Sequence, residues 1–456
     1  MGSPRASRPV PGVLLAQEQL LPFLLNPQSY PHRPRSVGLI QTHSSFVLVA
    51  PPFVYKVKKP VNFGFLDFST LEKRRQFCER EVELNRRLCP HTYLGVIPIV
   101  RTRDGFAFGT DGTVVEYAVR MRRLRDGCFL DQRIRRGEVR TTDLNRVVRV
   151  LRDFYRAQKP TAEIESWGRV ERLRISTDEN FRQIHEFIGQ TVSQPACQAL
   201  RHFTDGFYSR FRSRLTARVR DGWIRDCHGD LHLDHIHLTR REILIFDCIE
   251  FNDRFRYVDV ANDAAFLAMD LDFHGRPDLS RRFVDRLASA LQDAGLAGMM
   301  DFYKCYRAVV RGKVETLHSG AHTVPEAERE TCAARARRYF QLALQYATVG
   351  SRPQVLVVMG RIGSGKSTLA RCLGEALGWP VVSSDALRKE MAGLPLFERS
   401  DTAVRARLYS RTMTERTYGR LLQAAVRHVR AGHGVILDAT FAQPRQRRRQ
   451  QRRFAT

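Results

Sequence analysis

Two stretches of the chain carry side chains suited to phosphate chemistry, and the more specific one lies near the C-terminus. Gly360-Arg-Ile-Gly-Ser-Gly-Lys-Ser367 matches the phosphate-loop motif G-x-x-x-x-G-K-[ST] in full. Lys366 is expected to reach the β- and γ-phosphates of ATP, and Ser367 is expected to hold Mg²⁺. The other residues expected to bind the nucleotide line the loop and the start of the next helix: Gly360, Gly363, Ser364, Gly365 and Thr368.

The second stretch is Cys227-His-Gly-Asp-Leu-His-Leu-Asp-His-Ile-His-Leu238, followed by Ile243-Leu-Ile-Phe-Asp-Cys-Ile-Glu-Phe251. It resembles the catalytic segment of aminoglycoside phosphotransferases and related small-molecule kinases. The resemblance implies that Asp230 is the catalytic carboxylate and that Asp247 holds Mg²⁺. Phosphoryl transfer needs both groups, because one carboxylate orients the attacking hydroxyl and another holds the metal that bridges the phosphates.

The segment departs from the family at His235, where the family has a metal-binding Asn. A neutral imidazole can ligate a divalent ion but suits Mg²⁺ less well than oxygen does, so His235 is a metal candidate that favours a transition metal. The neighbouring histidines suggest zinc as an alternative, with positions 233, 235 and 237 on one strand face. We find no carboxylate or cysteine to complete a zinc set there.

Upstream, Phe53-Val-Tyr-Lys-Val-Lys-Lys-Pro60 and Cys78-Glu-Arg-Glu-Val-Glu-Leu84 resemble the family's nucleotide-binding strand and the helix behind it. The resemblance implies that Lys56 contacts the phosphates and that Glu81 is its partner. Lys58 lies on the same strand face as Lys56 and remains an alternative, as do Glu79 and Glu83 for the partner. Between the first two strands, Thr42, His43 and Ser45 occupy the loop that covers the phosphates in relatives.

In the C-terminal part, Val381-Val-Ser-Ser-Asp-Ala-Leu-Arg388 resembles a strand end of gluconate-kinase-like and polynucleotide-kinase-like enzymes. The resemblance implies that Asp385 activates an acceptor hydroxyl and that Arg388 contacts the substrate. A helix N-cap at Ser384 or Asp385 is the alternative interpretation. Asp438 ends an apolar strand-like run and is expected near Mg²⁺.

The order of elements predicts the fold class. Residues 1–30 are expected to form a tail and a short helix around Leu14–Leu25. A β-rich lobe is expected over 31–125, with strands at 37–41, 46–50, 53–58, 94–100 and 114–121. A helix should start in a capping box at Ser69-Thr-Leu-Glu72. A helical lobe over 126–349 and a P-loop domain over 350–456 follow. This is an α+β protein-kinase-like two-lobed domain followed by an α/β P-loop NTPase domain.

A resemblance to two-part bacterial proteins covers residues 12–445. It includes Gln41-Thr-His-Ser-Ser, the long run from Tyr55 to Arg75, and Ala265-Phe-Leu-Ala-Met-Asp-Leu271. These proteins join an aminoglycoside-phosphotransferase-like domain to an AAA-type P-loop kinase-like domain. The second domain is expected to be truncated here, with an incomplete parallel sheet and the phosphate-loop strand at its edge.

Composition and charge indicate which partners and which cellular compartment to expect. The net charge is +27, but the arginines are spread along the chain, and the densest cluster, residues 445–453, is expected to be a solvated tail. No apolar run could span a membrane, no secretory signal is recognised, and the nine cysteines are scattered, which predicts a cytoplasmic protein with reduced thiols.

The sequence therefore predicts an ATP- and Mg²⁺-dependent phosphotransferase that acts on a hydroxyl of a small molecule. A kinase for 5′-hydroxyl ends of nucleic acid and a nucleotide-sensing protein with weak catalysis remain alternatives. The first rests on Asp385, Arg388 and the positive charge, and the second rests on His235.

Overall fold

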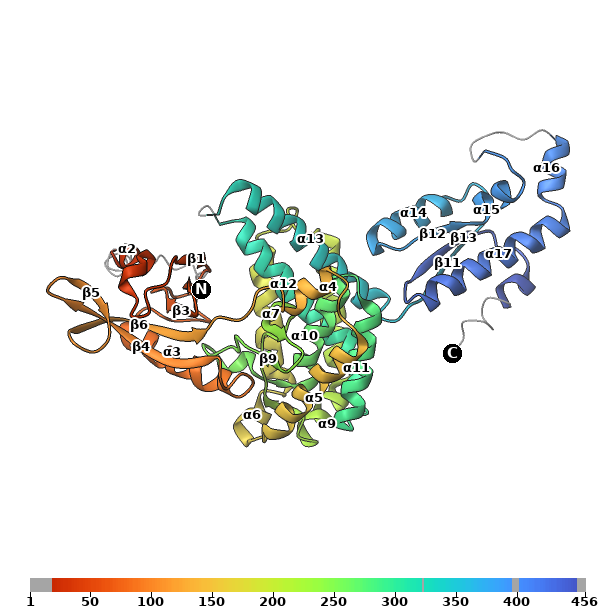
Figure 1. Ribbon diagram of the computed structural model, residues 1–456. Helices are drawn as coiled ribbons and strands as arrows, with labels where there is room; N and C mark the ends of the chain where they lie inside the picture. Colours follow the sequence, from red (N-terminus) through yellow and green to blue (C-terminus); the bar gives the residue numbers. More distant parts are fainter. Residues whose placement is uncertain (1–18, 322–323, 396–401, 449–456) are drawn as a thin grey trace. The chain divides into compact units, whose positions relative to one another are not determined.

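The computed structural model describes residues 19–321, 324–395 and 402–448 (Figure 1). The chain divides into two compact units that interleave along the sequence. Unit 1 comprises residues 1–176, 210–274 and 282–299, and unit 2 comprises residues 177–209, 275–281 and 300–456. The expected domain boundaries after residues 30, 125 and 349 stay predictions.

Unit 1 begins with an antiparallel sheet in the strand order β1-β2-β3-β6-β4-β5. Five of these strands were expected from the sequence. The additional strand, β5, is a four-residue hairpin partner that opens on a glycine, too short for a recognisable alternation. The strands are β1 Gly38–Gln41, β2 Ser45–Ala50, β3 Phe53–Lys58, β4 Tyr93–Thr102, β5 Gly105–Phe108 and β6 Thr113–Arg122.

The two faces of this sheet bury different sets of side chains. On one face Tyr55 and Val57 of β3 pack in a core with Leu20 and Leu24 of α2 (Leu20–Leu25). The expected helix began at Leu14, and its first residues lie outside the described residues. On the other face α3 (Leu71–Arg86) lies against β4 and β6. Because side chains alternate along a strand, Lys56 and Lys58 project toward α3.

The expected capping box of α3 is wrong by one residue. Thr70 is the N-cap, and its hydroxyl accepts a hydrogen bond from the backbone N–H of Lys73 at 3.2 Å. Ser69 instead donates from its hydroxyl to Asp67 at 2.6 Å. Asp67 also accepts from the backbone N–H of Ser69 at 3.0 Å, so both groups of Ser69 bind back to Asp67 and the helix starts one residue later.

Short β-pairs and the buried helix α10 hold the segment around Asp230. The antiparallel pairs join β7 (Ile224–Asp226) to β10 (Tyr257–Asp259) and β8 (Ile236–Leu238) to β9 (Ile243–Ile245). Every residue of α10 (Val260–Phe273) from Val260 to Leu271 is buried. The other helices with residues in unit 1 are α4 Leu130–Arg135, α5 Thr141–Ala157, α6 Ala162–Ser166, α7 Val170–His185, α9 Arg212–Arg220 and α11 Pro277–Leu291.

Unit 2 contains a helical part and a small parallel sheet. Two long helices, α12 (Met300–Ser319) and α13 (Glu326–Thr348), pack along each other, and the ring of Phe340 lies against Gly312. Residues of α8 (Gln194–Arg210) also belong to this unit. A side chain at Gly312 would meet that ring at 3.0 Å, which explains the glycine.

The parallel sheet has the order β11-β13-β12 in the described residues, so the phosphate-loop strand β11 lies at an edge, as expected. Helices cover both faces: Ile436 packs with α14, while Val435 and Leu437 pack with α17 (Figure 1). The elements are β11 Val355–Met359, α14 Lys366–Leu377, β12 Val381–Ser383, α15 Ser384–Met391, α16 Thr402–Leu408, α17 Arg411–Arg430 and β13 Val435–Ala439.

No described helix combines the length and the apolar character that a membrane crossing requires. All nine cysteines are free thiols.

Candidate active site

Lys56 and Glu81 meet between β3 and α3. The Lys56 ammonium lies 2.9 Å from Glu81 Oε1 and 2.7 Å from Asp247 Oδ1. Glu79 pairs with Arg75 on the exposed side of α3, and Glu83 is exposed as well. Of the three glutamates left open by the sequence, only Glu81 therefore faces the strand.

Lys58 contacts the same glutamate from a more deeply buried position. Its ammonium lies 2.6 Å from Glu81 Oε2 and also pairs with Glu250. The Lys58 side chain is 1% exposed and the Lys56 side chain 15% exposed. Lys56 is thus the lysine that reaches the accessible part of the site, whereas Lys58 supports Glu81 from behind.

Lys56, Lys58 and Glu81 keep one another ionised, whereas burial raises the pKa of Glu250. Burial opposes ionisation of Glu81, but Lys56 and Lys58 outweigh it and hold the pKa of Glu81 below its usual value. Burial likewise opposes the charge of Lys58, yet Glu250 and Glu81 raise its pKa. Glu250 was missed by the sequence reasoning, because its contact with Lys58 joins segments 192 residues apart in the chain.

The loop that carries Asp230 is anchored by carboxylates of α10. The backbone N–H groups of His228 and Gly229 donate to Asp263 at 3.2 and 2.8 Å, and Tyr155 donates its hydroxyl to the same carboxylate at 2.8 Å. Gly229 has φ +88°, and a Cβ there would lie 2.9 Å from the carbonyl oxygen of Phe255. A side chain at Gly229 would therefore displace the loop.

A second carboxylate of α10, Asp270, accepts from the backbone N–H of Leu233 at 2.9 Å. Sequence reasoning gave neither Asp263 nor Asp270 a role, although the segment Ala265–Leu271 carried part of the family resemblance. Both lie in a helix whose buried face is mostly apolar, and a buried Asp in such a helix is the signal that could have found them.

His235 lies between the two catalytic candidates. Its Nδ1 is 3.0 Å from the backbone carbonyl oxygen of Asp230, and because a carbonyl can only accept, Nδ1 carries the proton. Its Nε2 then presents a lone pair 3.5 Å from Asp247 Oδ2. Burial, and then the neighbouring His232, lower the pKa of His235 and favour this neutral form.

Two acceptors that face each other without a proton between them suit a bound cation. Asp247 and His235 would hold a divalent ion there, and Asp247 has φ +61°, a strained conformation that aims its carboxylate into the site. Burial opposes ionisation of Asp247, but the Lys56 ammonium outweighs it and lowers the pKa of Asp247, so its carboxylate is ionised and fit for a metal.

The local structure around the histidines also differs from the sequence prediction. Leu233–His235 is a 3₁₀ turn and β8 starts only at Ile236, so positions 233, 235 and 237 do not share a strand face. The expectation that no carboxylate completes the histidines is wrong, because the turn brings His232 and His235 back to Asp230, with candidate ligand atoms within 4.8 Å of one another.

The loop between β1 and β2 is closed by hydrogen bonds to Thr42. The Thr42 hydroxyl accepts from the backbone N–H of Ser45 at 3.0 Å, and the Lys59 ammonium donates to the Thr42 carbonyl oxygen at 2.7 Å. Of the three predicted residues, Thr42 and His43 are exposed and Ser45 is buried.

The phosphate loop joins β11 to α14 as the motif requires. Gly363 and Gly365 have φ of +80° and +79°, which side chains other than glycine rarely adopt, and a Cβ at Gly360 would lie 2.8 Å from Ser364 Oγ. The Lys366 ammonium is 3.1 Å from the carbonyl oxygen of Arg361. Thr368 is exposed in the first turn of α14.

Ser367 and Asp438 meet at the carboxyl end of the sheet. The Ser367 hydroxyl donates to Asp438 Oδ2 at 2.7 Å, and the buried Asp438 Oδ1 has no hydrogen-bond partner among the described residues. A buried carboxylate oxygen beside a phosphate loop fits Mg²⁺, so these two residues would hold the ion there.

Asp385 and Arg388 share a third residue, Tyr409, which sequence reasoning missed. The Tyr409 hydroxyl donates to Asp385 Oδ1 at 3.1 Å, and the Arg388 guanidinium stacks 4.3 Å from the centre of the Tyr409 ring. The N-cap of α15 is Ser383, whose side chain accepts from the N–H of Asp385. Neither Ser384 nor Asp385 is therefore the cap.

The solved structures that resemble part of this chain include two that are kinases or relatives of kinases by name. A choline kinase from Cryptosporidium parvum has a TM-score of 0.40 at 11% identity, over 69% of this chain and 92% of that chain. A choline/ethanolamine kinase family protein from Mesorhizobium loti has a TM-score of 0.39 at 11% identity, over 74% of this chain and 100% of that chain.

Sequence comparison gives the closer matches. A family model described as "AAA domain" matches residues 355–456. A shikimate kinase from Gloeobacter violaceus is 41% identical over 86 residues, or 18% of this chain and 45% of that enzyme. Uncharacterized proteins of Mycobacterium tuberculosis and Mycobacterium bovis are 35% identical over 414 residues, which cover 90% of this chain and 80% of each relative. The chain therefore belongs to the family of these mycobacterial proteins, and its residues 355–456 form the part that matches the AAA domain.

Proposed function

We propose that unit 1 is an ATP-dependent phosphotransferase that acts on a hydroxyl group of a small molecule. One observation carries the proposal: Lys56, Asp247 and Asp230 come from separate segments and lie around His235 and Glu81 in one site. Phosphoryl transfer depends mainly on positioning and charge stabilisation, and these are the groups it requires.

Each side chain has a role in this proposal. Lys56, held by Glu81, neutralises charge on the nucleotide phosphates. A divalent ion at Asp247 and His235 would supply further charge stabilisation. Asp230 orients the acceptor hydroxyl and takes its proton while the oxygen–phosphorus bond forms and the bond to the leaving ADP oxygen breaks.

The proposal is tested by phosphoryl transfer from labelled ATP to a panel of sugars, aminoglycosides and nucleosides. Asp230→Asn should lower turnover by about 10²-fold or more and leave ATP binding near the wild-type value, because it removes the base but not the phosphate contacts. Asp234→Asn is the matched control, since Asp234 lies in the same loop with a side chain 53% exposed. Equal turnover in the Asp230→Asn variant and the wild type would refute the assignment.

We propose that the P-loop AAA domain binds a second nucleotide. The hydrogen bond between Ser367 and Asp438 supports this, because it places a hydroxyl and a carboxylate at the loop as in Mg²⁺–nucleotide sites. Asp385, Arg388 and Tyr409 would contact an acceptor there, and a nucleic-acid 5′-hydroxyl end is the second candidate acceptor. Transfer to a 5′-hydroxyl oligonucleotide that Lys366→Ala abolishes would support this; transfer unaffected by Lys366→Ala would contradict it.

A further inference from the structure

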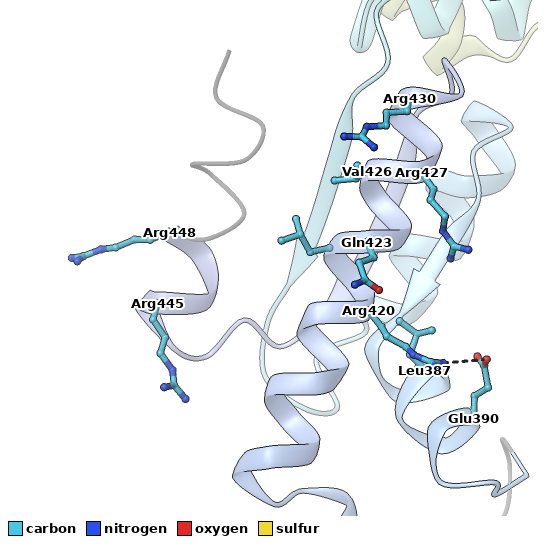
Figure 2. Close-up of a pocket in the computed structure, with 10 residues that line it drawn as sticks. Leu387, Glu390, Arg420, Gln423, Val426, Arg427, Arg430, Arg445 and Arg448 are labelled. Atoms are coloured by element: carbon cyan, nitrogen blue, oxygen red, sulfur yellow. Dashed lines mark ion pairs between the residues drawn. The ribbon is translucent and has the colours of Figure 1, made fainter.

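A groove in unit 2 is lined by charged side chains that are almost all positive. It has a volume of about 1400 Å³ and lies against α15, α17 and the helical residues 444–448. Leu387, Leu422 and Val426 give it apolar parts. Its arginines come from α17 and from the C-terminal helical turn, as Figure 2 shows: Arg420, Arg427, Arg430, Arg445 and Arg448.

The general arginine content of the chain does not account for this lining. The whole chain has 75 Lys and Arg against 48 Asp and Glu, whereas the described lining of the groove has five arginines and a single acid, Glu390. Glu390 lies 3.7 Å from Arg420, and Arg445 lies 3.3 Å from Glu415. Within the described part of the chain, Arg427, Arg430 and Arg448 have no carboxylate within 4.0 Å. The groove thus keeps a large uncompensated positive charge.

We propose that this groove binds the phosphodiester backbone of a nucleic-acid strand. Guanidinium groups match phosphate oxygens in geometry as well as charge. The run from Arg420 to Arg430 covers about 15 Å of helix, and nucleic-acid phosphates follow one another every 3.4 Å or so along each strand axis, so the run spans about four of them. A concave surface fits a strand, whereas an anionic membrane presents a broad surface.

The recognition is independent of base sequence. Among the residues that the structure describes, no aromatic side chain lines the groove, so these residues offer no platform on which a base could stack. Gln423 is the one uncharged polar side chain in the described lining, too little for a pattern of base contacts. Phosphate contacts without base contacts position a strand but do not select its sequence. The expectation that residues 445–453 form a solvated tail therefore gives way, for Arg445 and Arg448, to a place in the groove.

The test is fluorescence anisotropy of the full chain with short labelled oligonucleotides, both single- and double-stranded DNA and RNA, over a range of salt concentrations. The groove variant is Arg427→Gln/Arg430→Gln. The matched control is Arg352→Gln/Arg371→Gln, which removes the same charge from exposed residues of unit 2 outside the groove. Arg448→Gln removes a groove charge without altering α17.

For a single strand, each lost phosphate contact should reduce the slope of log K against log salt by about 0.7, so the groove variant should lose about 1.4 and Arg448→Gln about 0.7. The control pair should keep the wild-type slope. The proposal is overturned if the wild type shows no salt-dependent binding, or if control and groove variants lose affinity equally. Binding to vesicles of anionic phospholipid without binding to any oligonucleotide would overturn it as well.

Discussion

Glu81 divides its buried carboxylate between two lysines, of which Lys58 is the more deeply buried. The Lys58 ammonium lies 2.6 Å from Glu81 Oε2 and also pairs with Glu250, while Oε1 of Glu81 faces Lys56. The lysine that positions Glu81 is thus a different one from the lysine that reaches the accessible site. Replacement of Lys58 is therefore expected to affect mainly stability, and replacement of Lys56 mainly nucleotide binding.

Lys58→Met should lower the free energy of unfolding by about 3 kcal/mol, because it leaves Glu250 buried without this partner. Urea unfolding measures the loss. Lys58→Met/Glu250→Met should recover most of it, since replacing both members of a buried pair is often nearly neutral. Lys56→Met should cost less stability but weaken nucleotide binding strongly. A Lys58→Met protein as stable as the wild type would contradict the supporting role.

His235→Asn should preserve or raise the activity with Mg²⁺, because an amide oxygen suits Mg²⁺ better than an imidazole nitrogen does. The wild type should accordingly favour Mn²⁺ over Mg²⁺ more than the variant does. Rates measured with each ion at saturating ATP give the two ratios. Loss of activity with both ions would mean that His235 has a role other than holding the metal.

His228→Gln should weaken the pH dependence of stability below pH 6.5. Burial lowers the pKa of His228 to about 4, against the opposing effect of the Asp263 carboxylate. As pH falls below about 6.5, the unfolded chain takes up a proton that the folded chain refuses, so stability decreases until about pH 4.

Between pH 6.5 and 5 this single group accounts for about 2 kcal/mol. Urea unfolding with EDTA present, at several pH values in this window, should show a smaller decrease for His228→Gln than for the wild type. The exposed His202→Gln is the control and should follow the wild type. Identical pH dependence in all three proteins would show that His228 is not held neutral.

Those parts of the site that depend on residue type and local order could be predicted from the sequence. Alternation along β3 placed Lys56 and Lys58 on one face, and the phosphate-loop motif placed Lys366 and Ser367 between a strand and a helix. The choice of Glu81 over Glu79 and Glu83 needed the orientation of α3 against β4 and β6, which no local pattern gives.

Other parts depended on contacts between distant segments. Glu250, Asp263 and Asp270 act through pairs far apart in the sequence, and Tyr409 lies beyond a stretch that carries no motif. A 3₁₀ turn at Leu233–His235 takes the place of the expected strand. The backbone N–H of Leu233 donates to Asp270, so it is not free to donate to a neighbouring strand.

Calorimetry with a non-hydrolysable ATP analogue tests most directly the central claim, that the two units build separate nucleotide sites. The wild type should bind two equivalents, and Lys56→Met and Lys366→Ala should each remove one, because Lys56 and Lys366 belong to different units. The site at Lys366 should be the weaker, since its loop is exposed and water is not excluded from it. A single equivalent in the wild type, lost in Lys56→Met and unchanged in Lys366→Ala, would contradict the second site and, with it, the roles of Asp385 and Arg388.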